Sequence, residues 1–310
     1  MKVGIIDLGT NTFNLLIAEI DDKGGYNPLY RSKIGVKLGE GSFSKNYITE
    51  DAMERAFVAL EAQITKIKNQ YCDRILAFAT AAVRNASNGQ QFVDKVSEQF
   101  GVNIMVIDGD KEAHMIYQGV QLAGALDENQ SLIMDIGGGS TEFIIANDQE
   151  IIWKKSYEIG VSRLMEKYNP SDPIEIQEEA AIRNYLSEQL SEAFDEARKE
   201  SVVQLIGSSG SFDTFSDVLA HRLGNFEEIK DLKSLAFEKE KLEQLLKELI
   251  WSKHSERERM EGMAVMRIRM IVLSAILTDM VMSEVDFENV KISRYALKEG
   301  VLFDVLKGNI

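Results

Sequence analysis

The chain is poor in cysteine, in proline and in long apolar stretches. Its single cysteine, Cys72, cannot form an internal disulfide, which fits a reducing cytoplasm, the location that we expect. The 3 prolines and the 45% share of hydrophobic residues indicate a chain that is folded throughout. The longest apolar stretch, Met270 to Met282, contains Asp279 and is too short to cross a bilayer, and no secretory signal follows Met1. We therefore expect no membrane partner.

Positive charge is also scarce. The formal net charge of −15 argues against nonspecific binding, so we expect no nucleic-acid partner. An anionic ligand would therefore need a local basic site. The basic residues considered for it are Arg31, Lys33, Lys37, Arg84, Arg267 and Arg269, and the alternative for each is an ordinary solvated charge. The histidines at positions 114, 221 and 254 are scattered and lack the spacing of zinc ligands.

What the chain does have is a run of three glycines in "MDIGGGSTEFIIA", from Met134 to Ala146. Strand-forming residues precede and follow the glycines, which predicts a β-hairpin. A P-loop or a dinucleotide fingerprint would need a helix after the glycines, so both match poorly. Successive N–H groups in such a turn can form an anion-binding nest. An ordinary hairpin turn is the alternative.

A second copy of this pattern, "IDLGTNTFNLLIA", lies near the N-terminus. Aligned without a gap, Asp7 matches Asp135, Gly9 matches Gly137, Thr12 matches Ser140 and Asn14 matches Glu142. Internal repetition of one unit predicts two related halves that face each other. Two facing nests would bind a chain of phosphates from both sides, and the aspartates are suited to hold a divalent cation through water.

A third glycine segment, "LIGSSGSF", runs from Leu205 to Phe212 and predicts a strand that leads into a helix. The N-terminus of a helix favours anions, although a plain strand-to-helix turn has the same pattern. The candidate phosphate-binding residues of the three segments are Asp7, Gly9, Thr10, Asn11, Thr12, Gly137, Gly138, Gly139, Ser140, Thr141, Gly207, Ser208, Ser209, Gly210 and Ser211.

The order of predicted elements indicates an α/β protein with mixed sheets. Three strands between Val3 and Val36 precede a helix that Thr49 caps. A strand at "RILAFAT", a helix over 87–100, a strand at "NIMVID" and a helix from Asp110 follow. After the second hairpin we predict helices over 175–200, 211–223, 239–251 and 264–284, then a strand at "NVKIS" and a helix at "ALKEGVLFDVL". Methionines 260, 263, 266 and 270 recur at helical spacing, which indicates core packing.

Together with "GDKEAHMIYQGV" and "ISRYALKEGVL", these segments resemble the exopolyphosphatase/guanosine pentaphosphate phosphohydrolase (Ppx/GppA) family over essentially the whole chain. The resemblance implies a duplicated actin-like fold, shared with sugar kinases and heat-shock ATPases, in which two lobes with mixed sheets surround a central cleft. Residues 1–117 with about 297–310 would form the first lobe, and residues 118–296 the second, more helical lobe. A hinge is expected near residues 116–124, and no additional C-terminal helical domain is expected.

The resemblance also implies roles for single residues. Glu112 matches the catalytic base, Arg84 matches a cleft arginine that contacts phosphate, and Asp135 and Glu142 match carboxylates that place magnesium and the attacking water. The expected metal set, acting through water, is Asp7, Asp135 and Glu142, and the expected basic rim is Arg31, Lys33, Lys37 and Arg267. Asn14 stands where many members carry arginine or histidine, which removes one cationic contact. Without the resemblance, Glu112 reads as a first-turn glutamate stabilised by the helix dipole.

Three functions fit these observations. The first is a magnesium-dependent hydrolase that releases terminal phosphate from polyphosphate or from guanosine pentaphosphate, which would place the protein in the bacterial stringent response. The second is an ATP-dependent phosphotransferase of the same superfamily, and the third is a polyphosphate or alarmone sensor without turnover. Fold alone does not separate them. A homodimer is one candidate assembly.

Overall fold

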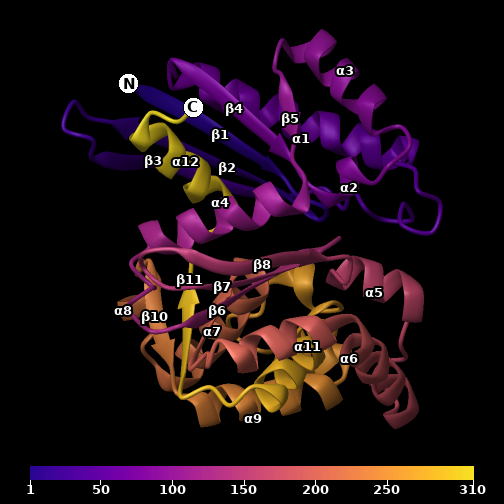
Figure 1. Cartoon of the computed structure of the whole chain (residues 1–310). Coiled ribbons are helices and arrows are strands. Elements are labelled where there is room, and N and C mark those ends of the chain that lie inside the picture. The colour runs from indigo at the N-terminus through magenta and orange to yellow at the C-terminus, as the bar shows by residue number, and fades with distance from the viewer.

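The computed structural model describes residues 1–310 and contains two β-sheets, drawn one above the other in Figure 1. The first sheet has the strand order β3-β2-β1-β4-β5. Its strands are β1 (Lys2–Leu8), β2 (Thr12–Ile20), β3 (Tyr26–Gly35), β4 (Arg74–Ala79) and β5 (Ile104–Val106). The helices α1 (Glu50–Asn69), α2 (Ala81–Arg84) and α3 (Gly89–Phe100) belong to the same half.

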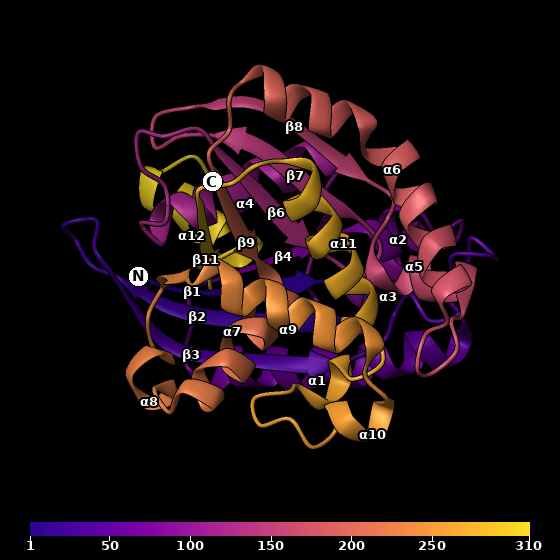
Figure 2. The same cartoon turned by 90° about the horizontal axis from the view of Figure 1, so that it is seen from below.

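The second sheet has the strand order β10-β11-β9-β6-β7-β8. Its strands are β6 (Ser131–Ile136), β7 (Thr141–Ala146), β8 (Ile151–Tyr157), β9 (Gln204–Ser208), β10 (Ser234–Phe237) and β11 (Asn289–Ser293). Its helices are α5 (Val161–Tyr168), α6 (Ile176–Lys199), α7 (Ser209–Leu223), α8 (Phe226–Ile229), α9 (Lys239–Trp251), α10 (His254–Arg257) and α11 (Ile271–Glu284). Seen from below, α7, α9 and α11 lie in front of this sheet (Figure 2).

The two halves repeat one design. In each, the first strand pairs antiparallel with the second and parallel with a later strand, β1 with β2 and β4, and β6 with β7 and β9. The hairpin registers place Asp7 opposite Asn14 and Asp135 opposite Glu142, as the ungapped alignment predicts. The turns also close alike, since Gly9 N–H donates to Thr12 O and Gly137 N–H to Ser140 O, both at 3.1 Å. The chain therefore has the duplicated α/β fold with two mixed sheets that was predicted.

Two helices join the halves. α4 (Gly109–Leu122) and α12 (Leu297–Lys307) pack against each other and lie between the sheets in Figure 1. α12 contacts β1 and β2, whereas α4 contacts β7 and β8. One apolar cluster unites Ile5 of β1, Met115 of α4, Ile144 of β7 and Val301 of α12. Side chains of both sheets therefore share one core, while the division into lobes at residues 117, 118 and 296 stays a prediction.

The predicted helix over 264–284 is wrong in its first part. Val265–Arg267 form a short 3₁₀ turn, and α11 begins only at Ile271. A tertiary contact explains the break, because Arg257 Nε donates to the carbonyl oxygen of Ile268 at 2.7 Å. Met266 is 42% exposed as a result and is not core, whereas methionines 260, 263 and 270 pack against the core.

The other predicted helices and strands lie within a few residues of their expected positions, and α2, α5, α8, α10 and β10 were not predicted. None of the helices combines the length and the apolar character that a membrane-spanning segment needs.

Candidate active site

The three glycine segments meet in one polar pocket of about 120 Å³ between the two halves. Eleven of the predicted phosphate-binding residues line it: Asp7, Gly9, Thr10, Asn11, Thr12, Gly137, Gly138, Gly139, Ser140, Ser209 and Gly210. The pocket lies where β1 and β6 end, since the turns that follow these strands supply most of its lining. The sequence repeat thus identifies two walls of a single site.

Four predicted phosphate-binding residues lie behind the pocket wall instead. Thr141 is fully buried, and the ring of Phe212 covers Gly207. Ser208 donates its hydroxyl to Asp135 Oδ2 at 2.5 Å, and the Ser211 hydroxyl lies 2.9 Å from that of Ser274. None of the four lines the pocket, so these predictions are wrong as direct side-chain ligands. Thr141 lies in β7, Gly207 and Ser208 lie in β9 and Ser211 lies in α7, and the contacts given above occupy or cover each of them.

The two hairpin turns face each other closely. A Cβ atom on Gly138 would lie 2.8 Å from Asn11 Nδ2 and 2.9 Å from Thr10 Cβ, so that position has no room for a side chain. The backbone N–H groups of Thr10, Asn11, Gly138, Gly139 and Ser140 donate to no acceptor within the protein. Unpaired N–H groups at a water-accessible turn are suited to bind anionic oxygens. The turns therefore form two opposed nests.

Basic side chains from both halves converge on the third segment. A Cβ atom on Gly210 would lie 2.0 Å from Arg267 Nη2 and 2.7 Å from Lys33 Nζ, so glycine permits both cations to approach this turn. Arg267 Nη1 donates to Ser211 Oγ at 3.2 Å. Desolvation and the neighbouring Arg267 lower the pKa of Lys33 to about 8. Two of the predicted rim residues, Lys33 and Arg267, thus lie in the pocket.

The other two predicted rim residues are engaged elsewhere. Arg31 Nη1 lies 2.7 Å from Glu299 Oε1, and Lys37 Nζ lies 3.7 Å from Glu40 Oε1. Neither side chain lines the pocket. Sequence reasoning missed three charged residues that do line it, Asp213, Arg294 and Lys298. The sequence could have identified Arg294 and Lys298, because both lie in "ISRYALKEGVL", one of the segments that carry the family resemblance.

The hairpin aspartates are arranged alike. Asp7 Oδ2 accepts a hydrogen bond from Asn14 Nδ2 at 2.9 Å, and Asp135 Oδ2 accepts from Ser208 and from Ser209 Oγ at 2.7 Å. The Oδ1 atom of each accepts no hydrogen bond within the protein. Burial raises the pKa of Asp7 to about 6, and it also raises the pKa of Asp135. Each hairpin therefore presents one free carboxylate oxygen to the pocket.

Glu112 lies in the first turn of α4, where Asp108 caps the helix by accepting from Lys111 N–H at 2.7 Å. Arg84, at the end of α2, donates from Nη1 to Glu112 Oε2 and to the carbonyl oxygen of Ile107, both at 2.9 Å. Burial and the charge of Glu142 raise the pKa of Glu112 well above its usual value, and Arg84 opposes this shift. Glu112 lines the pocket and Arg84 does not, and the contact of Arg84 with phosphate stays a prediction.

Glu142 lies behind the pocket wall and is 1% exposed. Its Oε1 accepts from Ser156 Oγ at 2.6 Å. Burial and the charge of Asp135 raise the pKa of Glu142 to about 7. No group of three or more His, Cys, Asp or Glu residues is arranged to ligate a metal ion directly.

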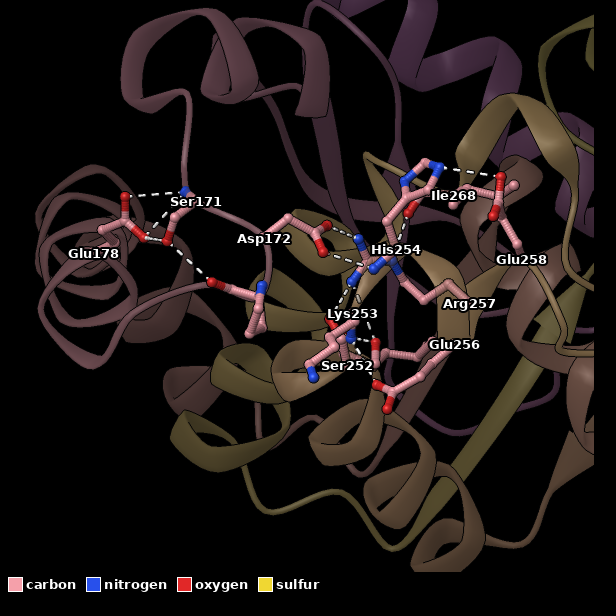
Figure 3. A network of polar contacts seen from close by, with 12 residues as sticks. Ser171, Asp172, Glu178, Ser252, Lys253, His254, Glu256, Arg257, Glu258 and Ile268 are labelled. Atoms are coloured by element: carbon pink, nitrogen blue, oxygen red, sulfur yellow. Dashed lines mark hydrogen bonds and ion pairs between the residues drawn. The ribbon is translucent and has the colours of Figure 1, made fainter.

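A buried polar network holds the segment that carries Arg267 (Figure 3). Arg257 is 1% exposed and donates to the Asp172 carboxylate and to the carbonyl oxygens of Ser252 and Ile268. Next to it, Arg269 Nη2 donates to Asn169 Oδ1 at 2.7 Å. The segment between α10 and α11 is thus tied to the turn before α6. No sequence pattern singles out Arg257, because its charged partner, Asp172, is 85 residues away in the chain.

Comparisons with known proteins identify the family of this chain. The model of the Ppx/GppA phosphatase family matches residues 16–309. Exopolyphosphatase 1 of Mycobacterium leprae is 28% identical over 307 residues, with coverage of 97% of this chain and 88% of that protein.

Two crystal structures resemble the whole chain. An exopolyphosphatase from Cytophaga hutchinsonii is 36% identical, covers 99% of this chain and 98% of its own, and superimposes with a TM-score of 0.96. The Aquifex aeolicus member of the Ppx/GppA family shares the fold at 22% identity, with coverage of 100% and 99% and a TM-score of 0.81. The chain belongs to the Ppx/GppA phosphatase family.

Proposed function

We propose that the protein is a phosphoanhydride hydrolase that releases terminal orthophosphate from inorganic polyphosphate. The observation that carries this proposal is the pair of opposed hairpin turns, whose residues with unpaired N–H groups line one pocket together with Glu112. The relatives named exopolyphosphatase support the choice of polyphosphate as substrate. Guanosine pentaphosphate ends in the same kind of bond and is the second substrate to be tested.

The charge distribution of the pocket suits phosphoryl transfer, which needs positioning and charge neutralisation more than covalent chemistry. The nests and the two cations at Gly210 would bind nonbridging phosphate oxygens, which are the atoms that carry charge in the transition state. Glu112 would orient a water molecule and accept its proton, a role that its raised pKa suits. Arg84 would favour the ionised form of Glu112, because it opposes the rise of the Glu112 pKa.

A divalent cation fits the donor set. The free Oδ1 atoms of Asp7 and Asp135 are hard oxygen donors, and magnesium commonly keeps several waters beside one or two carboxylates. Glu142 would contact water bound to the ion and would not contact the ion itself. When bound, magnesium would neutralise phosphate charge and polarise the bond that breaks.

Phosphate release tests the proposal. The purified protein is incubated with magnesium and, separately, long-chain polyphosphate, tripolyphosphate, guanosine pentaphosphate and ATP. We expect release from polyphosphate, and loss of release in Glu112→Gln. Binding of polyphosphate without release would favour the sensor, and phosphate transfer from ATP to an acceptor would favour the kinase. Either result would overturn the proposal.

A further inference from the structure

A second hollow opens directly from the pocket. It lies between β3, the edge strand of the first sheet, and the segment that leads into β10, the edge strand of the second. Its volume is about 640 Å³, against about 120 Å³ for the pocket. The two share the lining residues Asn14, Lys33, Asp213, Arg294 and Lys298. A linear ligand bound in the pocket can therefore continue into the hollow without leaving the protein surface.

The wall of this hollow is basic although the whole chain carries a net charge of −15. Its six basic residues are Arg31, Lys33, Lys230, Lys233, Arg294 and Lys298. Only Asp213 and Asp231 are acidic, and only 2 of the 13 lining residues are hydrophobic. A nucleoside would require an apolar or aromatic slot, whereas a row of cations suits a polyanion.

Two of these cations, Arg31 and Lys298, pair with a buried carboxylate. Glu299 is fully buried and lies 2.7 Å from Arg31 Nη1 and 3.2 Å from Lys298 Nζ. The guanidinium of Arg31 lies 4.9 Å from the ring centroid of Tyr295. The Arg31 side chain remains 39% exposed, so the accessible part of the Arg31–Glu299 pair is its cation.

Two lysines of the hollow, Lys230 and Lys233, are less constrained. Lys233 Nζ donates to the Tyr26 hydroxyl at 3.1 Å, and the Tyr26 hydroxyl lies 3.3 Å from that of Tyr295. These contacts connect β3 with the segment before β10, so the hollow spans both halves of the protein. Lys230 pairs only with the exposed Glu227, and exposed pairs of this kind are weak. Both lysines can therefore turn to a phosphate.

We propose that this hollow is a subsite for the internal phosphates of a linear polyphosphate whose terminal phosphate lies in the pocket. This inference rests on the proposed function. Lysines act as compact point charges on flexible stems and need no fixed geometry, which suits a repetitive chain that moves forward after each cleavage. The subsite would favour long chains over tripolyphosphate, which is too short to fill both cavities.

The double substitution Lys230→Ala/Lys233→Ala tests the subsite. Both side chains are exposed and lie outside the pocket, so the fold should persist, as thermal unfolding can verify. For long-chain polyphosphate we expect KM to rise at least about fivefold. The slope of log KM against log salt should fall by about 1.4, by analogy with single-stranded polyanions. For tripolyphosphate KM should change by less than about twofold.

The matched control is Lys68→Ala/Lys247→Ala, which removes the same charge from exposed positions on α1 and α9 that line neither cavity. It should leave both substrates unaffected. If the wild type hydrolyses both substrates and the Lys230/Lys233 variant matches it, the subsite is wrong while the proposed function stands. An equal loss with tripolyphosphate would also overturn the subsite.

If the wild type releases no phosphate at all, the proposed function fails, and calorimetric binding of long-chain polyphosphate decides the subsite separately. Weaker binding by the Lys230/Lys233 variant than by the control would support the subsite. Equal binding by the two would overturn it.

Discussion

Arg84 and Glu112 form an ion pair at the wall of the pocket, with Nη1 of the arginine 2.9 Å from Oε2 of the glutamate. The arginine therefore acts on the carboxylate that lines the pocket instead of lining it. Its second bond, to the carbonyl oxygen of Ile107, fixes the guanidinium just before α4 begins. This arrangement suits Arg84 to control the charge of Glu112, and its contact with phosphate stays a prediction.

Glu112→Gln should lower kcat for polyphosphate by roughly 10²–10⁴ if Glu112 is the general base, because an amide cannot accept the proton. Substrate affinity should stay within a few-fold, since glutamine still accepts from Arg84. Steady-state phosphate release and direct binding measure the two quantities. Normal turnover in this variant would refute the base assignment.

Arg84→Met should move the pH profile of activity to higher pH. Arg84 lowers the pKa of Glu112, so its loss raises that pKa, and a higher pH is then needed to ionise the base. At pH 7 the variant should be less active, with partial recovery at pH 9. The salt dependence of KM should change little, because Arg84 does not line the pocket. A pH profile identical to that of the wild type would contradict this role.

Asp135→Asn and Glu142→Gln should both raise the magnesium concentration needed for half-maximal rate, and excess magnesium should restore part of the activity. The reason is that each removes a negative charge near the proposed ion. Glu112→Gln serves as the contrast, because additional magnesium should not restore it. Magnesium titrations of the three variants at saturating polyphosphate make the comparison. Equal magnesium requirements in all three would argue against these carboxylates as metal residues.

Asp7→Asn should stabilise the protein at pH 7.5 while impairing turnover. The pKa of Asp7 is about 6 in the folded protein against an ordinary 3.8, so the ionised form destabilises the fold. The associated stability is present below about pH 4 and is lost as the pH rises through about 6. We expect a gain of about 1–3 kcal/mol in the free energy of unfolding at pH 7.5 and almost none at pH 4. Urea unfolding at the two pH values tests this sign, and a gain that is equal at both would contradict it.

Arg257→Met should cost about 3–5 kcal/mol of unfolding free energy, because it leaves the carbonyl oxygens of Ser252 and Ile268 without their buried donor. Asp172→Asn should cost only about 1 kcal/mol, since an amide oxygen still accepts from Arg257. Urea unfolding compares the two. Equal losses would show that Asp172, and not the network as a whole, limits stability.

The local sequence determined many of the helix ends and turns of this protein. Thr49 caps α1 by accepting from Ala52 N–H at 3.3 Å, and Gly101 ends α3 with a φ of 68°. The two hairpins follow from strand residues around glycine turns. Hydrogen bonds within a few residues of each other decide these features, so a short window of sequence contains the necessary information.

Only the tertiary structure decided which charges meet. The predicted helix breaks before Ile271, where Arg257 donates to the carbonyl oxygen of Ile268. Packing likewise turns Arg84 toward Glu112 and brings Lys298 into the pocket. A long basic side chain has many rotamers and reaches several partners. Its direction therefore depends on which distant carboxylate or carbonyl the fold brings within reach, and this information is absent from any local pattern.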